Sequence, residues 1–274
     1  MLTFQRRFPL LGLAAIAMAW LGMSAKAEPL SLGSGVTNAA LAATGALPRL
    51  KARLDAGGEI RIIAFGSSST EGAGASSPAS TYPALLQRDL SESLRLGVAG
   101  RPAVNVINRG KGGDDAEAMA RRLQRDVLAD RPDLVIWQTG SNDPMTGVPV
   151  ERFSQLTRDG IAAIRSTGSD VVLMDQQWCR RLSGIDGAER YAAALHALAA
   201  ELGVPVIRRH ALMKTWVDKG IMTPSQMIGP DGLHMTDAGY DRLAKAASNQ
   251  ILVQVGLAPA MSVAPSRADP SAHN

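Results

Sequence analysis

Two kinds of segment alternate along the middle of the chain. Short and nearly continuous apolar runs are typical of strands that are buried on both faces of a sheet. Five such runs lie at residues 60–65, 103–108, 133–138, 170–175 and 204–207. The stretches between them predict helices at 82–94, 114–129, 150–165, 187–202, 210–219 and 236–255.

The segment 114–129 has the clearest helical spacing. Its apolar residues recur every three or four positions, which predicts one buried face. The same spacing puts Arg121, Arg122 and Arg125 on the opposite face, where we expect them to meet solvent.

Strand and helix alternate five times, which implies a parallel sheet with helices on both faces. We therefore predict an α/β fold, a three-layer α/β/α sandwich with a five-stranded parallel sheet of the flavodoxin-like type. Ligands of such open sheets bind beyond the carboxyl ends of the strands. The segments that follow the first four strands are GSSSTEG, NRGKGGDD, TGSNDP and QQWCRR, and they hold the candidate functional residues.

The two ends of the chain differ from this middle part. Residues 1–27 combine Arg6 and Arg7, an apolar stretch shorter than the ~20 residues of a bilayer-spanning helix, and Ala25-Lys26-Ala27. This pattern predicts a cleaved export signal and hence a periplasmic or secreted protein with no stable membrane insertion; an uncleaved anchor is the alternative. Residues 28–57 are predicted to be a lead-in that includes a helix, and 258–274 a disordered tail. Residues 58–257 remain as the catalytic domain.

The charge and cysteine content of the chain argue against several classes of function. The net charge is +4, but all three charged residues of segment 1–27 are basic, so 26 basic and 25 acidic residues remain after cleavage. No basic cluster with interleaved aromatic residues is present, which argues against nucleic acid as a partner. The single cysteine, Cys179, excludes an intramolecular disulfide, and there is no cysteine pair to bind zinc.

The glycine- and serine-rich loop at 66–74 has two main interpretations. A phosphate-binding P-loop requires a lysine, which this loop lacks, and its glycines do not have the spacing of a dinucleotide-binding loop. A flavodoxin-like mononucleotide site remains open. A nucleophilic serine requires a base and oxyanion donors elsewhere in the chain.

Among the four histidines, His234 has the most suitable context for a base. It lies in GPDGLHMTDAGY, a loop before the last predicted helix, and Asp231 precedes it by three residues. An aspartate in that position can accept the Nδ1 proton and leave Nε2 free to take a proton from a serine. The same pair could instead cap a turn and pack.

The segments quoted above resemble the sequence blocks of the SGNH (GDSL-type) hydrolases, a family of esterases and lipases. FGSSST resembles the first block, NRGKGGDD the second, TGSNDP the third and DGLHMTDAGY the fifth, in the order of the family. This resemblance spans residues 65–240. Ser67 departs from it, because the usual first block, F-G-D-S-x-T, has aspartate at that position.

The resemblance assigns roles to five positions. It implies that Ser68 is the nucleophile, that His234 is the base and that Asp231 orients His234. The oxyanion donors would be the backbone N–H groups of Ser68 and Gly113 and the side-chain amide of Asn142. The departure at Ser67 keeps Ser67 and Ser69 as alternative nucleophiles, and Asp143 is expected to support the loops.

These roles imply an exported esterase that forms an acyl-enzyme without any metal or organic cofactor. Its substrate would be a small-molecule or polysaccharide acyl ester, with short-chain O-acyl groups on carbohydrate favoured. Gln177 and Trp178, at the exit of the fourth strand, are candidate substrate-binding residues at the rim. An O-acyltransferase of the same fold and a non-catalytic glycan-binding envelope protein are the alternatives, and the sequence does not define the oligomeric state.

Overall fold

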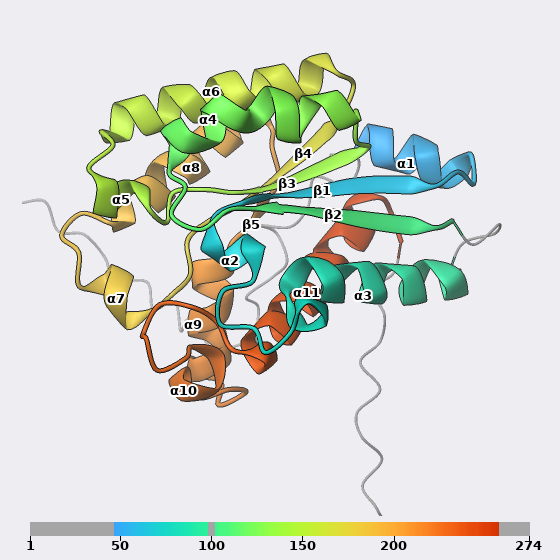
Figure 1. Ribbon diagram of the computed structural model, residues 1–274. Coiled ribbons are helices and arrows are strands. Elements are labelled where there is room, and N and C mark those ends of the chain that lie inside the picture. The colour runs from blue at the N-terminus through green and yellow to red at the C-terminus, as the bar shows by residue number, and fades with distance from the viewer. Residues whose placement is uncertain (1–46, 98–101, 258–274) are drawn as a thin grey trace, which may run out of the picture. The chain divides into compact units, whose positions relative to one another are not determined.

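A sheet of five parallel strands forms the middle layer of the structure (Figure 1). The strands are β1 (Ile60–Gly66), β2 (Val104–Gly110), β3 (Leu134–Gln138), β4 (Asp170–Met174) and β5 (Val206–Ile207). They lie in the order β2-β1-β3-β4-β5, so the connections on the two sides of β1 run in opposite directions. This order confirms the predicted three-layer, flavodoxin-like fold.

The computed structural model describes residues 47–97 and 102–257, and all of them belong to one compact unit. The predicted export signal at 1–27, residues 28–46 of the predicted lead-in and the predicted tail at 258–274 lie outside the described residues. Within the described ranges, no helix has both the length and the apolar character needed to cross a membrane.

Helices cover both faces of the sheet (Figure 1). One face packs against α4 (Ala116–Asp126), α6 (Val150–Ser166) and α8 (Glu189–Leu202). The other packs against α1 (Pro48–Asp55), α3 (Tyr82–Gly97), α9 (Arg209–Asp218) and α11 (Asp237–Gln254). Four short helices lie in the connecting segments: α2 (Ser68–Glu71), α5 (Asp143–Thr146), α7 (Arg180–Ser183) and α10 (Pro224–Met227).

Alternate residues of each central strand belong to opposite layers. In β1, Ile62 and Ala64 pack with α3 and α11, whereas Ile63 and Phe65 pack with α4, α6 and α8. Strand β3 repeats this division. Because both faces are buried, an apolar residue is favoured at every position, which explains the continuous apolar runs in the sequence.

Helix α1 belongs to the same core, although it precedes residue 58, where the sequence analysis began the domain. Leu50 and Leu54 are buried in the cluster with α3 and α11. The backbone N–H of Leu50 also donates to the carboxylate of Asp170, 2.9 Å away, at the start of β4. The folded domain therefore extends at least to residue 47.

Local chemistry sets two element bounds that differ from the prediction. Helix α4 begins at Ala116 rather than at 114, because the Asp115 side chain caps it by accepting the N–H of Ala118 at 2.9 Å. Strand β5 has only two residues. Pro205 precedes it and has no N–H to donate to a neighbouring strand.

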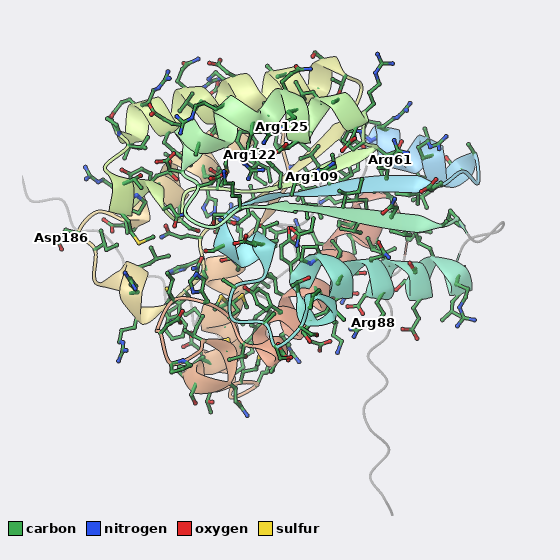
Figure 2. All side chains as sticks on the ribbon, viewed as in Figure 1. Arg61, Arg88, Arg109, Arg122, Arg125 and Asp186 are labelled. Atoms are coloured by element: carbon green, nitrogen blue, oxygen red, sulfur yellow. The ribbon has the colours of Figure 1, made fainter. Side chains whose placement is uncertain are left out.

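The predicted exposure of Arg122 on helix α4, which Figure 2 labels, is wrong. Arg121 and Arg125 are exposed, as expected, but Arg122 is 6% exposed and lies over the ring of Phe65, 4.4 Å from its centroid. The helical spacing alone could not separate Arg122 from its neighbours, because most of the groups that bind it lie outside the helix, on β1, on β2 and in the loop after β2.

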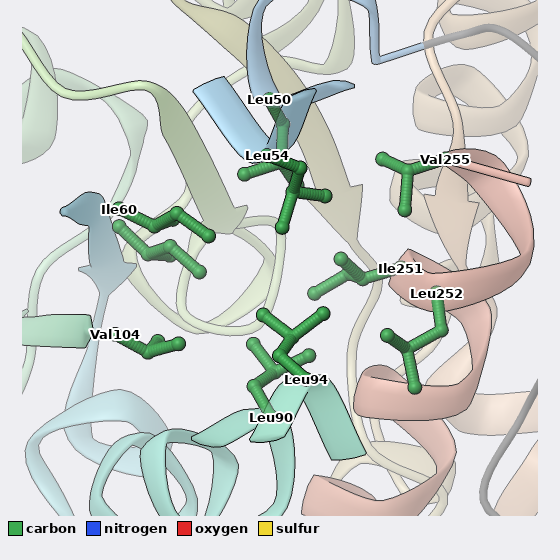
Figure 3. Close-up of a pocket in the computed structure, with 10 residues that line it drawn as sticks. Leu50, Leu54, Ile60, Leu90, Leu94, Val104, Ile251, Leu252 and Val255 are labelled. Atoms are coloured by element: carbon green, nitrogen blue, oxygen red, sulfur yellow. The ribbon is translucent and has the colours of Figure 1, made fainter. Parts of the chain in front are cut away.

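A small cavity lies near the first residues of β1 and β2, which are Ile60 and Val104 (Figure 3). It holds about 10 Å³ and all ten of its lining side chains are apolar. That space is barely enough for one water molecule, and nothing polar lines it to bind one. We interpret it as a packing defect at the end of the sheet where the strands begin, opposite the end that carries the loop at 66–74.

Candidate active site

Ser68 lies at the first position of α2, directly after β1 ends at Gly66. Ser67 caps this short helix in an extended conformation, with φ −96° and ψ −151°. Ser67 and Ser69 are each 1% exposed, whereas the Ser68 side chain is only partly buried. Of the three serines that the sequence left as alternatives, Ser68 is therefore the one that a substrate can reach.

Asp231 and His234 lie in the loop between α10 and α11, and the fold brings both to Ser68. The imidazole Nε2 of His234 is 3.0 Å from Ser68 Oγ, although the two residues are separated by 166 positions. The imidazole Nδ1 is 2.6 Å from Asp231 Oδ2. The three side chains thus form a continuous hydrogen-bonded series from hydroxyl to imidazole to carboxylate.

The charge on Asp231 is stabilised by its own loop. Burial raises the pKa of this carboxyl group, but hydrogen bonds from the backbone N–H groups of Leu233 and His234, both at 3.0 Å, and from the imidazole lower it. The lowering effects prevail, so the pKa lies below its ordinary value. Asp231 is therefore an anion near neutral pH and fixes the backbone of the loop as well as the ring of His234.

The loop after β2 lies beside Ser68. A Cβ atom added to Gly112 would be 3.9 Å from the Cβ of Ser68, and the N–H of Gly112 donates to Glu71 Oε2 at 2.9 Å. The next residue, Gly113, is exposed and has a φ of +80°, a conformation that favours glycine. The structure thus brings the loop that carries Gly113 next to Ser68.

Asn142 is tied to that same loop. Its side-chain Nδ2 donates to the backbone carbonyl of Asp114, the residue after Gly113, at 2.8 Å. A carboxamide nitrogen has two N–H bonds, so this contact leaves one for a ligand.

Arg122 is buried because it connects three parts of this edge of the sheet. Its guanidinium donates to the carbonyls of Gly66 and Arg109, both at 2.8 Å, and to the carboxylate of Asp114 at 2.5 Å. The ends of β1 and β2 and the loop beside Ser68 are therefore held by one side chain.

Asp143 connects the segment after β3 with the start of helix α4. Its carboxylate is fully buried and accepts the N–H of Ala116, the first residue of α4, at 2.9 Å. Burial raises its pKa to about 6, against the opposing effect of backbone N–H donors such as that of Ala116. This position agrees with the supporting role expected for Asp143.

Gln177 does not have the place at the rim that the sequence analysis gave it. It is 2% exposed, and its Oε1 accepts from the hydroxyl of Ser141 at 3.2 Å and from Arg209 at 2.8 Å. Its Nε2 donates to the carbonyl of Leu233 at 3.2 Å. The expectation of a substrate contact is therefore wrong for Gln177, whose polar atoms bind inside the protein.

Trp178 is partly exposed and lines a cleft of about 610 Å³. The cleft lies between the segment 178–183 and the segment 224–236. Gly229, Pro230 and Gly232 line it, so it borders the loop that carries Asp231 and His234.

The loop after α2 approaches the His234 loop closely. The hydroxyl of Tyr240 donates to the carbonyl of Ala73 at 2.7 Å. The next residue, Gly74, has a φ of +88°, and an added Cβ would lie 2.5 Å from the carbonyl of Met235 and 3.2 Å from the Cβ of His234. Only glycine leaves room for this approach.

The sequence analysis missed three buried polar residues around the site, namely Arg122, Gln138 and Arg209. Gln138 did leave a signal, because it is a polar residue at the end of the otherwise apolar strand β3. Arg122 and Arg209 left none, since each looks like a surface arginine until its partners on other segments are known.

Comparison with known proteins identifies the class of this protein. Its sequence matches the non-GDSL lipase-like family over residues 34–256, which is most of the chain, and the chain belongs to that family. The match includes helix α1. No curated protein matches the chain by sequence.

Solved structures with the same fold include several esterases and lipases. A lipase/acylhydrolase from Enterococcus faecalis is 25% identical, with a TM-score of 0.58, and the alignment covers 73% of this chain and 98% of that one. A two-domain esterase active on acetylated mannans is 22% identical, with a TM-score of 0.63 and coverage of 76% and 53%. An acetyl xylan esterase is also 22% identical, with a TM-score of 0.57 and coverage of 69% and 98%. Family and fold together confirm an SGNH-type ester hydrolase.

We expect Gly74→Ala to lower kcat for ester hydrolysis sharply, because the added methyl group would displace His234 and Met235. Gly168→Ala is the matched control. Gly168 has a φ of +80°, so the backbone strain is similar, but an added Cβ would meet nothing within 4 Å. Gly168→Ala should lose about 1–2 kcal/mol of stability from backbone strain, and Gly74→Ala should lose more because of the added contact, as urea denaturation can measure. An equal kcat for the two variants would contradict the steric explanation.

We expect the contribution of Asp143 to the stability of the wild-type protein to be lost as pH rises between about 4 and about 6. The pKa of Asp143 is about 6 in the folded state against 3.8 for a free side chain, so the folded state binds more protons in this window. Asp143→Asn keeps an acceptor oxygen for the N–H of Ala116 and should remove this part of the pH dependence.

The measurement is the free energy of unfolding in urea at several pH values across that window. Asp186→Asn, at an exposed position, controls for the loss of one negative charge (Figure 2). Parallel profiles for the wild-type protein and Asp143→Asn would refute the assignment to Asp143.

Proposed function

We propose that this protein is an exported serine esterase that hydrolyses short-chain O-acyl groups on carbohydrate through a Ser-His-Asp acyl-enzyme mechanism. The observation that carries this proposal is the contact between His234 Nε2 and Ser68 Oγ at 3.0 Å, with Asp231 Oδ2 at 2.6 Å from Nδ1. The segment at 1–27 supports export.

In the first step, Ser68 Oγ attacks the carbonyl carbon of the ester while its proton passes to His234 Nε2. The carbonyl oxygen becomes an oxyanion, which the backbone N–H groups of Ser68 and Gly113 and the remaining amide N–H of Asn142 stabilise. Each such donor contributes about 2.7–4 kcal/mol to stabilisation of the transition state. Asp231 keeps Nδ1 protonated and stabilises the imidazolium that forms.

The tetrahedral intermediate then collapses. The bond to the leaving alkoxide breaks, and His234 gives that oxygen the proton that came from Ser68. Water attacks the acyl-enzyme in the same way, with His234 as the base, and releases the carboxylic acid. The enzyme returns to its starting protonation state.

The cleft beside Trp178 supports a carbohydrate as the bound part of the substrate. Its lining combines the indole with polar groups such as Arg180, Ser183 and Ser225, so it offers an apolar face and hydrogen-bonding groups together. It borders the loop of Asp231 and His234, which supports the binding of a sugar on the side of the active site formed by that loop. Two of the similar structures are esterases whose names refer to acetylated mannans and acetyl xylan.

Ser68→Ala should reduce hydrolysis of p-nitrophenyl acetate by at least about 1,000-fold, because no nucleophile remains beside His234. Ser69→Ala is the matched control: Ser69 is buried, and its Oγ has no hydrogen-bond partner among the described residues. It should keep its activity. Full activity of a folded Ser68→Ala protein would exclude Ser68 as the nucleophile.

Trp178→Ala should raise KM for an acetylated polysaccharide and leave kcat/KM for p-nitrophenyl acetate close to the wild-type value. The small ester does not need the cleft, whereas a sugar chain would lose the aromatic face. Trp178→Phe keeps a ring and should recover part of the affinity. Release of acetate measures both reactions, and equal losses on the two substrates would contradict a carbohydrate-binding role for Trp178.

A further inference from the structure

A series of buried polar side chains connects the loop of Ser68 with the loop of His234. Its members are Ser67, Gln138, Ser141 and Gln177, and none is more than 3% exposed. It begins at the residue before Ser68 and ends at the carbonyl of Leu233, the residue before His234.

Every hydrogen bond of this series donates in the same direction. Ser67 donates to Gln138 Oε1 through its N–H at 2.9 Å and its hydroxyl at 3.0 Å. Gln138 Nε2 donates to Ser141 Oγ at 3.1 Å, and that hydroxyl donates to Gln177 Oε1 at 3.2 Å. Gln177 Nε2 then donates to the carbonyl of Leu233 at 3.2 Å. Hydrogen bonds aligned in this way polarise and strengthen one another in a buried setting.

Arg209 determines which way Gln177 faces. Arg209 is fully buried, and its Nη2 donates to Gln177 Oε1 at 2.8 Å. Within the described residues, no carboxylate forms an ion pair with Arg209. The negative charge of Asp175 stabilises the guanidinium from beyond ion-pair distance, but the direct hydrogen-bond acceptors of Arg209 are neutral oxygens. The carboxamide of Gln177 must therefore turn its oxygen toward the guanidinium. The nitrogen of that carboxamide then points to Leu233.

We propose that Gln177 and Arg209 are positioning residues that set the distance between Ser68 and His234 through this buried series. One end of the series is Ser67, next to Ser68, and the other is the carbonyl of Leu233, next to His234. If one hydrogen bond of the series is broken, the loop of Ser68 can move relative to the loop of His234. The effect on turnover rests on the function proposed above, whereas the effect on the distance does not.

Gln177→Glu tests positioning separately from stability. The carboxylate can still accept from Ser141 and gives Arg209 an anionic partner, which should offset part of the cost of burying it, so we expect the variant to remain folded in a melting experiment. It cannot donate to Leu233, and its oxygen would instead repel that carbonyl. We expect kcat for p-nitrophenyl acetate to fall by about 10- to 100-fold, while KM stays within about twofold.

Because Gln177→Glu adds a negative charge, the kcat values of the two proteins must be compared with His234 in the same protonation state. A carboxylate near His234 can move the pH profile, so kcat is compared on the plateau that each protein reaches. Gln176→Leu is the control for altering a buried amide at the same strand exit, since Gln176 Oε1 has no hydrogen-bond partner in the described part of the chain. Its plateau kcat should remain within about twofold of the wild-type value.

Crystal structures of the wild-type protein and of Gln177→Glu provide a measurement that needs no turnover. We expect the distance from His234 Nε2 to Ser68 Oγ to lengthen beyond hydrogen-bond range in the variant. An unchanged distance, or an unchanged plateau kcat in a folded variant, would overturn the proposal. If the wild-type protein hydrolyses no ester, the proposed function fails, and the distance still decides the role of Gln177.

A second variant covers the case in which Gln177→Glu does not fold. Gln138→Glu keeps the acceptor for Ser67 and Thr70 but removes the donor to Ser141. The same loss of kcat and the same longer distance are expected. Failure of both variants to fold would show that the series is required for folding rather than for positioning, and would also overturn the proposal.

Discussion

The contact between His234 and Ser68 joins two loops that no regular secondary structure holds together. A hydrogen bond of 3.0 Å tolerates little displacement, and the acyl transfer that we propose depends on it. Strand β1 fixes where the segment of Ser68 starts, but the loop of Asp231 and His234 lies between α10 and α11, and no strand fixes either of its ends. The chain therefore fixes these ends with side chains from neighbouring segments, and much of the buried polarity of the molecule is found there.

Two buried arginines illustrate how this is done. Arg122 binds the carbonyls at the ends of β1 and β2 and the carboxylate of Asp114, while Arg209 binds Gln177 and the carbonyl of Asp175 at the ends of the neighbouring segments. Carbonyl groups at strand ends have fewer partners than those inside the sheet, and an unpaired buried carbonyl is costly. The carbonyl of Gly66 accepts from Arg122 as well as from the N–H of Lys111. A guanidinium has five donors in a rigid plane, so one side chain can satisfy several carbonyls and fix the loops that carry them.

Ser67 fits the same arrangement. The usual first block of the SGNH hydrolases has aspartate at this position, and an ionised carboxylate can only accept hydrogen bonds. In this chain the carboxamide oxygen of Gln138 faces position 67 and accepts from Ser67 and Thr70. A carboxylate at position 67 would lie against the oxygen of Gln138, and two acceptors repel each other. The observed orientation of Gln138 therefore requires a residue at 67 whose side chain can donate, as serine does. This explains how the first block can lose its aspartate and still hold its loop in place.

The sequence by itself determined the layers, the five parallel strands and the edge at which the special residues gather, because burial on both faces leaves a pattern of apolar runs that does not depend on distant contacts. The resemblance of its short motifs to the SGNH blocks also indicated Ser68, Asp231 and His234. Only the tertiary structure decided that Arg122 and Arg209 are internal, that Gln177 is no rim residue and that Ser68 is the accessible serine. Those properties depend on which groups from other segments surround each side chain, and one position in a linear sequence carries no record of those neighbours.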